Sequence, residues 1–214
     1  MATLNPVFRS LRRVHKDLVT QKAKFALVGG LAVSARGHSR YTADVDIAVA
    51  VSSDAESEYL VAALICGGYH VRTLLEQDAT GRLATVRLIG PVQTTPEVIV
   101  DLLFASCGIE REIVAKADTL EVSRGVRVPV ASLGHLIAMK VLSESSARLQ
   151  DQTDLIKLIE NAADSELEHA RYALLLITER GFNRDRDLLA SLEEFITRVR
   201  TQVEDPWLRE RRLE

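Results

Sequence analysis

The sequence predicts an α+β fold in which a domain of strands and helices is followed by a C-terminal helical bundle. Two observations support this prediction. As far as Val130, short apolar runs bounded by glycine, proline or polar residues recur, as expected of strands. After Ser132 the apolar residues recur at helical spacing, and no convincing strand remains. We therefore expect two domains, residues 1–131 and residues 132–214.

The individual elements follow from apolar periodicity and from turn residues. Gly29-Gly30 ends the first strand, and the Ser53–Glu56 spacing is that of a capping box that begins a helix. A second capping box is expected at Ser165 and Glu168. The expected strands are 25–28, 44–51, 69–75, 83–89 and 98–104, with a hairpin over 120–130. The expected helices are 8–21, 31–36, 53–66, 109–117, 133–143, 149–161, 166–180 and 187–200.

Composition and charge argue against several classes of protein, including basic nucleic-acid binders and membrane proteins. Apolar residues make up 47% of the chain, which is enough for a well-formed core. The formal net charge of -3 excludes a nucleic-acid binder that is basic overall, and the cluster Arg9, Arg12 and Arg13 reads first as a solvated helix face. The start of the chain lacks the apolar core of a signal peptide, and no apolar run is long enough for a membrane helix. We therefore expect a soluble cytoplasmic protein that does not bind a membrane.

The cysteines and histidines do not suggest a metal site. Cys66 and Cys107 are far apart in the sequence and lack metal-ligand spacing, so reduced structural thiols are expected. The five histidines are scattered, and none falls into a zinc-binding pattern.

Asp44 and Asp46 form the first feature with chemical meaning. Two carboxylates at positions i and i+2 of a strand point to the same face and lie close together. Because like charges at that separation repel, a divalent cation that prefers oxygen ligands would stabilise them. Taken alone, the pair also fits the wet face of an edge strand.

A glycine pair before Asp44 and Asp46 and a third acid after them support a functional role for the two carboxylates. Gly29-Gly30 follows an apolar strand and precedes a helix, so the backbone can approach a phosphate there and offer free N–H groups. Asp101 lies within the otherwise apolar run 98–104, where an unpaired charge would be costly. Three carboxylates beside a phosphate-binding turn suit two-metal phosphoryl transfer.

These residues resemble the signature of a known group of enzymes. Gly29-Gly30, Asp44-Val45-Asp46 and Asp101 are similar to the motif of the nucleotidyltransferase superfamily with the DNA polymerase β-like fold. Within it, residues 27–47 (LVGGLAVSARGHSRYTADVDI) most resemble the AbiEii/AbiGii type of abortive-infection toxin, which belongs to bacterial toxin–antitoxin systems. The resemblance covers about residues 24–160. It implies a nucleotidyltransferase-type mixed sheet flanked by helices.

The helical part of the chain adds to the resemblance. Lys140, Arg148, Asp151 and Asp154 match the helical motif of that toxin group, a lysine followed by an arginine and acids. In this motif Lys140 is expected to contact the phosphates of the nucleotide as a point charge. The alternative is a helix lysine that faces solvent. The roles of the other three residues stay open, since the two acids also suit pairing with Arg148 and Lys157.

The resemblance implies a role for each residue of the first block. Gly29 and Gly30 would hold the triphosphate of an NTP substrate, and Asp44 and Asp46 would bind Mg²⁺ or Mn²⁺. Asp101 would complete the metal site or deprotonate the acceptor hydroxyl. Arg40 and Thr42 stand where many members carry a basic residue and a small hydroxyl residue, so they are candidate nucleotide-binding residues.

Three functions remain consistent with the sequence. In the first, the chain transfers a nucleoside monophosphate from an NTP to RNA, such as a tRNA end, as a toxin with a cognate antitoxin. In the second, the acceptor is a small hydroxylated compound such as an antibiotic. In the third, the chain is a nucleotide-binding module without turnover, against which the presence of all three acids argues. The sequence does not identify the acceptor, the preferred NTP or the oligomeric state.

Overall fold

The computed structural model describes residues 5–37, 41–77, 81–94, 96–144 and 149–204, and the chain divides into two compact units, Met1–Ser132 and Leu133–Glu214. The strands are β1 (Lys24–Val28), β2 (Val45–Ala50), β3 (His70–Glu76), β4 (Leu83–Ile89), β5 (Ile99–Leu103), β6 (Asp118–Ser123) and β7 (Val126–Val130). The helices of the first unit are α1 (Pro6–Thr20), α2 (Gly29–Ala35), α3 (Asp54–Cys66) and α4 (Glu110–Ala115). Those of the second are α5 (Leu133–Ser143), α6 (Leu149–Glu160), α7 (Asp164–Glu179) and α8 (Leu188–Glu204).

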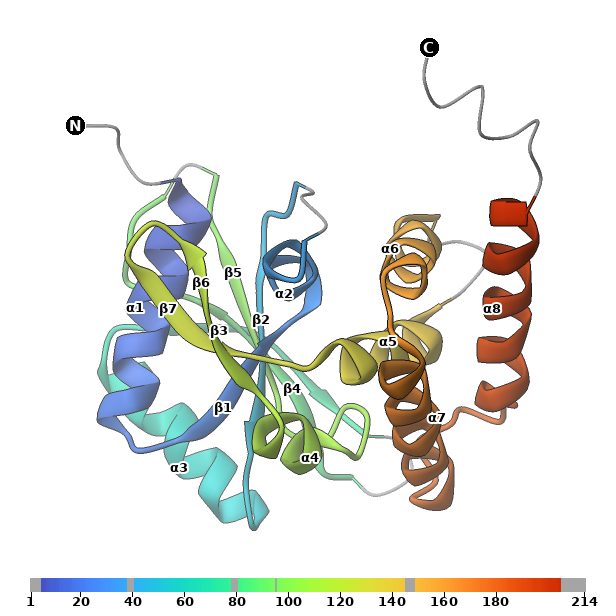
Figure 1. The fold of residues 1–214 in the computed structure, drawn as a ribbon. Coiled ribbons are helices and arrows are strands. Elements are labelled where there is room, and N and C mark those ends of the chain that lie inside the picture. The colour runs from blue at the N-terminus through green and yellow to red at the C-terminus, as the bar shows by residue number, and fades with distance from the viewer. Residues whose placement is uncertain (1–4, 38–40, 78–80, 95, 145–148, 205–214) are drawn as a thin grey trace. The chain divides into compact units, whose positions relative to one another are not determined.

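The first unit is built on one seven-stranded mixed sheet with the strand order β3-β4-β5-β2-β1-β7-β6 (Figure 1). The pairs β2–β5 and β1–β7 are parallel, and the other neighbours are antiparallel. The central strands β1, β2 and β5 are rich in buried apolar residues, which fixes them in the middle of the sheet. The predicted α+β class, with a mixed sheet flanked by helices and followed by C-terminal helices, is confirmed.

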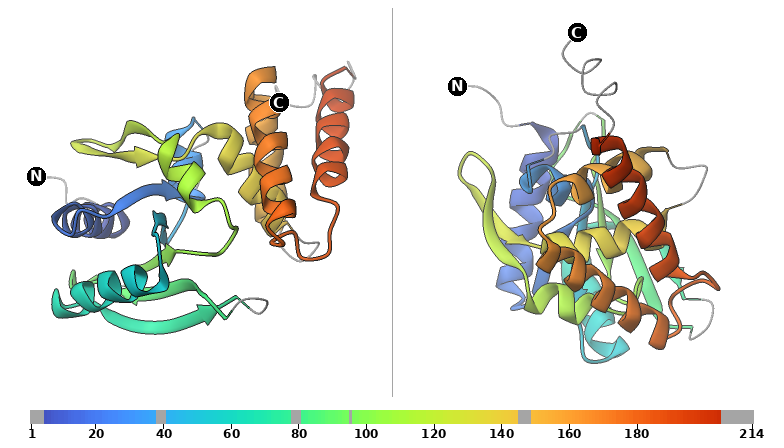
Figure 2. Two further views of the ribbon diagram at one scale, coloured as in Figure 1. Left: turned by 90° about the horizontal axis from the view of Figure 1, so that it is seen from below. Right: turned by 45° about the vertical axis from the view of Figure 1, so that its right-hand side comes forward.

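Helices α1 and α3 lie on the same side of the sheet (Figures 1 and 2). The Asn5 side chain caps α1 by accepting a hydrogen bond from the Val7 N–H at 3.0 Å. Near its other end, Asp17 accepts hydrogen bonds from the hydroxyl of Tyr69 at 2.8 Å and from Nε of Arg13 at 2.7 Å. Tyr69 is buried and directly follows the glycine pair that ends α3, so this network ties the ends of the two helices together.

In the second unit α5 packs against α6 and α7, and α7 and α8 run side by side (Figure 2). Gly134 permits the close approach of α5 and α7, because a Cβ at this position would lie 2.8 Å from the carbonyl oxygen of Glu166. Arg171 of α7 reaches Glu193 of α8, with 2.6 Å between Nε and Oε1. Among the described residues, no helix is both long and apolar enough to cross a membrane.

The boundaries of several elements differ from the prediction. Helix α2 begins at Gly29 and not after the glycine pair, and Asp44 directly precedes β2. The capping box predicted at Ser165 and Glu168 is wrong. Helix α7 begins one residue before Ser165, and the Glu166 carboxylate accepts the N–H of the N-cap residue Ala163 at 2.9 Å. The N-cap at Ser53 is confirmed, since its hydroxyl accepts the N–H of Glu56, but the Glu56 carboxylate accepts the N–H of Ser52 and so does not complete the predicted box.

Candidate active site

Asp46 and Gly29 come into direct contact where β1 ends and α2 begins. Asp46 lies opposite Val28 in the antiparallel register of β1 and β2. The next residue, Gly29, has φ +63°, a conformation that favours glycine. A Cβ at Gly29 would lie 2.5 Å from Cγ of Asp46 and 2.8 Å from its Cβ. The Asp46 side chain therefore occupies the space that any other residue at position 29 would need.

Asp101 lies beside Asp46 on the neighbouring strand. The two residues are register partners in the parallel pair β2–β5, and Asp101 is buried. Asp44 lies two residues before Asp46 and is half-buried. Burial raises the pKa of Asp44 above its usual value, the negative charge of Asp101 raises it further, and Arg87 opposes both effects. The three predicted acids thus form one cluster, called here the acid cluster.

Arg87 is a member of this site that the sequence reasoning missed. It lies on β4 opposite Asp101, and its Nε and Nη2 donate to the two carboxylate oxygens at 2.9 Å and 2.7 Å. Hydrogen bonding to Asp101 raises the pKa of Arg87, and the negative charges of Asp101, Asp44 and Asp46 raise it further. In the sequence, each of these two strands carries a single charged residue among apolar ones. That pattern alone does not predict an ion pair, because the pairing depends on the strand register that places Arg87 opposite Asp101.

The remaining predicted residues of the first unit are less closely tied to the acids. Thr42 is half-buried, its hydroxyl donates to the carbonyl oxygen of Asp44 at 3.5 Å, and it lines a cavity of about 320 Å³ with Tyr41 and Leu31. Gly30 is buried in the first turn of α2. Arg40 lies outside the described residues.

Lys140 anchors a second cluster, within the second unit. Its Nζ lies 2.6 Å from Oδ1 of Asp151 and 2.9 Å from Oδ2 of Asp154. Only 12% of the Lys140 side chain is exposed, so this is not a helix lysine that faces solvent. Asp154 is buried, and Asp151 is half-buried. Both acids therefore pair with Lys140, whereas Arg148 lies outside the described residues.

Comparison with known protein families decides the assignment. The model of the nucleotidyl transferase AbiEii toxin family, of type IV toxin–antitoxin systems, matches residues 11–210. The chain belongs to this family. The predicted resemblance to AbiEii-type nucleotidyltransferases is confirmed, and with it the general class of the enzyme.

Solved structures resemble this AbiEii chain at low identity. An antigenic nucleotidyltransferase-like protein from Paracoccidioides brasiliensis is 20% identical, with 88% of this chain and 92% of the other covered and a TM-score of 0.49. A putative nucleotidyltransferase from H. pylori is 15% identical, with coverages of 97% and 96% and a TM-score of 0.46. The antibiotic-resistance factor ANT(2'')-Ia is 18% identical, with coverages of 92% and 94% and a TM-score of 0.43. Among curated proteins, no sequence matches the chain.

The acid cluster of this AbiEii chain suits a hard divalent cation by its chemistry. Its side chains offer only carboxylate oxygens, the ligand type that such ions prefer, and burial together with the negative charge of Asp101 raises the pKa of Asp44. Arg87, however, already engages both oxygens of Asp101. Within the described part of the chain, no three side chains of the metal-binding types are grouped to hold an ion. In this arrangement Asp101 could bind a cation only in exchange with Arg87.

Proposed function

We propose that the chain transfers a nucleoside monophosphate from an NTP to RNA, such as a tRNA end, and acts as the toxin of a toxin–antitoxin pair. One observation carries the proposal: the Asp46 carboxylate rests against Gly29 and lies in register with Asp101. This arrangement brings acidic side chains to the glycine turn, which is where the family motif is expected to bind the phosphates. The family to which the chain belongs supports the reaction class and a cognate antitoxin as partner.

The roles proposed for the residues follow from these positions. Asp44 and Asp46 would hold Mg²⁺ or Mn²⁺, which when bound would neutralise charge on the phosphates. Gly29 and Gly30 would hold the triphosphate through their backbone N–H groups. Asp101 would complete the cation site or accept the proton of the acceptor hydroxyl. Arg40, Thr42 and Lys140 remain proposed contacts of the nucleotide, and the cytoplasm, where NTPs and RNA meet, is the proposed location.

The test is transfer of label from each of the four NTPs, with Mg²⁺, to total cellular RNA. The double variant Asp44→Ala/Asp46→Ala runs beside the wild type. Its matched control is Glu58→Ala/Glu179→Ala, which removes two exposed carboxylates outside the cluster. We expect labelled RNA with the wild type and the control, and a loss of at least about a hundredfold in the Asp variant.

Other outcomes would replace the proposal. If RNA stays unlabelled and an aminoglycoside becomes labelled, the acceptor is a small hydroxylated compound. If no acceptor is labelled while NTPs still bind, the chain is a binding module without turnover.

A further inference from the structure

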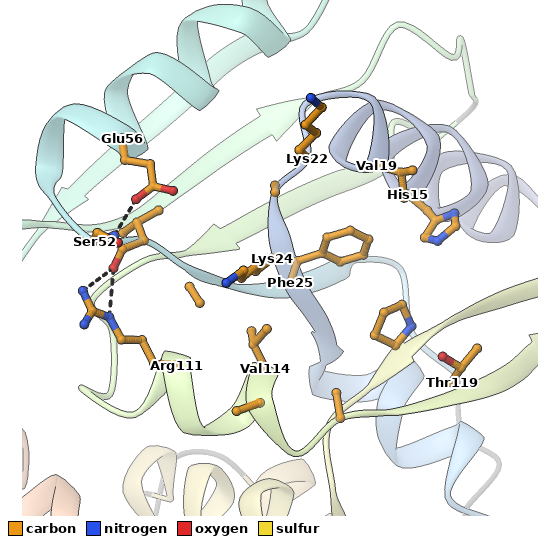
Figure 3. A pocket seen from close by; sticks show the side chains of 16 residues that line it. His15, Val19, Lys22, Lys24, Phe25, Ser52, Glu56, Arg111, Val114 and Thr119 are labelled. Carbon is orange, nitrogen blue, oxygen red and sulfur yellow. Dashed lines mark hydrogen bonds between the residues drawn. The ribbon is translucent and has the colours of Figure 1, made fainter.

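A cavity of about 840 Å³ lies in the first unit, at the end of β1 and β2 opposite the acid cluster. It is lined where Lys24 of β1 pairs with Ala50 of β2, whereas the acid cluster begins where Val28 pairs with Asp46. The β1 pocket, as we call it, is bounded by α1, the loop into β1, the end of β2, and α4 (Figure 3). Its volume falls in the range of small-molecule sites in proteins.

The pocket forms because β7 separates from β1 at this end. The described residues of these parallel strands pair at Leu27 and Val130, and the Ala131 N–H donates to the Leu27 carbonyl at 3.0 Å. No register pair joins Phe25 to β7 within these two fully described strands. Because backbone groups alternate along a strand, the N–H and carbonyl of Phe25 point toward the same side as the Leu27 carbonyl. A ligand in the opening would therefore meet polar backbone groups.

The lining combines positive charge with apolar walls. Lys22, Lys24 and Arg111 all line the cavity, and Glu56 is the one carboxylate among its lining residues (Figure 3). The Glu56 carboxylate accepts a hydrogen bond from the N–H of Ser52 at 2.5 Å and, within the described residues, forms no ion pair with the three cationic residues. Arg111 is held in place by two hydrogen bonds to the Val51 carbonyl at 3.0 Å and 2.8 Å.

The apolar wall includes a ring pair. The rings of His15 and Phe25 meet edge to face with their centres 5.6 Å apart. Val114 and Pro129 line the same cavity, and the large apolar side chain of Val19 at its border is 55% exposed. Apolar atoms next to unneutralised cations favour a ligand that has both an anionic group and an apolar body.

Lys22 has a left-handed backbone conformation where α1 ends. It occupies the position after the C-cap of α1, with φ +58°, and its N–H donates to the Val19 carbonyl at 3.0 Å. The Ala23 N–H donates to the Leu18 carbonyl at 3.0 Å, which completes a Schellman motif. Glycine is the usual residue there because other residues are strained in this conformation. The lysine keeps an ammonium group at the border of the pocket despite that strain.

We propose that the β1 pocket is a binding site for a small organic anion with an apolar ring body, separate from the acid cluster. Lys22 and Lys24 would pair with the anionic group, and the apolar lining residues on either side of β1, among them Phe25 and Val114, would contact the ring.

The test titrates isotope-labelled full-length protein with three probes followed by amide NMR shifts. These are 1-naphthoate, the uncharged 1-naphthalenemethanol with the same ring system, and inorganic phosphate with charge alone. We expect 1-naphthoate to shift the amide signals of Lys24, Phe25 and Ser52, and to bind at least about fivefold more tightly than either other probe. Equal binding of the acid and the alcohol, or shifts confined to other regions, would overturn the proposal.

A second experiment tests the role of the two lysines by reversing their charge. The variant Lys22→Glu/Lys24→Glu changes two exposed side chains and should weaken binding of 1-naphthoate by about tenfold while leaving the alcohol unchanged. Lys157→Glu, an exposed lysine outside the pocket, should leave both unchanged. Asp44→Ala/Asp46→Ala should also bind 1-naphthoate normally, which separates this proposal from that of nucleotidyl transfer. Saturation by an acidic peptide in place of 1-naphthoate would assign the pocket to a protein partner and refute the small-anion site.

Discussion

Gly29 is the residue whose replacement most directly tests the geometry of the acid cluster. An alanine there would be strained at φ +63°, and its Cβ would overlap the Asp46 side chain. We expect Gly29→Ala to lower the free energy of unfolding by about 2–3 kcal/mol and to reduce nucleotidyl transfer at least about tenfold. Urea unfolding and the label-transfer assay measure the two effects.

Gly81→Ala is the matched control for Gly29→Ala. Gly81 has the same φ of +63°, but a Cβ there would meet no atom within 4 Å. It should therefore lose about 1 kcal/mol from strain alone and keep full activity. If the two variants unfold alike, the overlap with Asp46 has no energetic weight, and the positioning assigned to Gly29 is wrong.

The ionisation of Tyr69 makes the free energy of unfolding depend on pH in the alkaline range. Burial raises the pKa of its hydroxyl well above the usual value, and so does the hydrogen bond to the Asp17 carboxylate. An unfolded tyrosine ionises near pH 10, as in model peptides. Above that pH the unfolded state loses a proton that the folded state keeps, so the free energy of unfolding falls as pH rises.

This effect predicts a difference between the wild type and Tyr69→Phe. At pH 7 the variant should be less stable by about 1 kcal/mol, because Asp17 loses one donor. From about pH 10 upward the gap should narrow, since phenylalanine cannot ionise. Urea unfolding at pH 7, 10 and 11 checks this. A gap that stays constant would show that Tyr69 ionises equally in both states.

At the scale of the strands, Arg87 links β4 to the acid cluster. Removing it with Arg87→Met leaves Asp101 buried without its bidentate partner, which should cost about 1–2 kcal/mol, because the arginine itself is 45% exposed. If Asp101 exchanges Arg87 for a cation, 10 mM Mg²⁺ should restore most of this loss. Arg82→Met, which breaks the exposed pair with Asp54, should show no such rescue. Absence of rescue in Arg87→Met would exclude Asp101 from the metal site.

At the end of α1, a substitution of Lys22 is expected to stabilise the fold, unlike the substitutions above. Lys22→Gly should relieve the strained backbone and raise the free energy of unfolding by about 0.5–1 kcal/mol. The same change removes a cation from the β1 pocket, so it should weaken 1-naphthoate about twofold. Thermal unfolding and NMR titration measure these effects. A variant that loses both stability and binding would show that Lys22 holds the turn by contacts of its side chain.

The elements also show where sequence reasoning reaches its limit. The alternation around Asp46 and the apolar run around Asp101 predicted both strands, because each pattern is local to a few residues. The pairing of Arg87 with Asp101 depends on strand order and register, which are set by contacts between residues distant in sequence. The start of α7 was misplaced because Ser165 has the right spacing to a glutamate, whereas the capping contact is made by Glu166 to Ala163.

For the whole molecule, the two compact units raise the question of which parts the reaction needs. The unit Met1–Ser132 contains the complete seven-stranded sheet, the acid cluster and the β1 pocket. Lys140 with its two aspartates belongs to Leu133–Glu214. We propose that the division near residue 132 separates two domains, as the change of pattern in the sequence predicts.

Residues 1–132 expressed alone test this proposal. Because the sheet and its buried strands are complete within the fragment, it should unfold cooperatively in urea and still bind 1-naphthoate. If Lys140 contacts the phosphates, the fragment should not transfer nucleotide. Full-length Lys140→Ala should then be equally inactive, and it should still bind 1-naphthoate. A fragment that unfolds without cooperativity would refute the domain division. An active fragment would instead remove Lys140 from the reaction and confine the chemistry to the acids around Gly29.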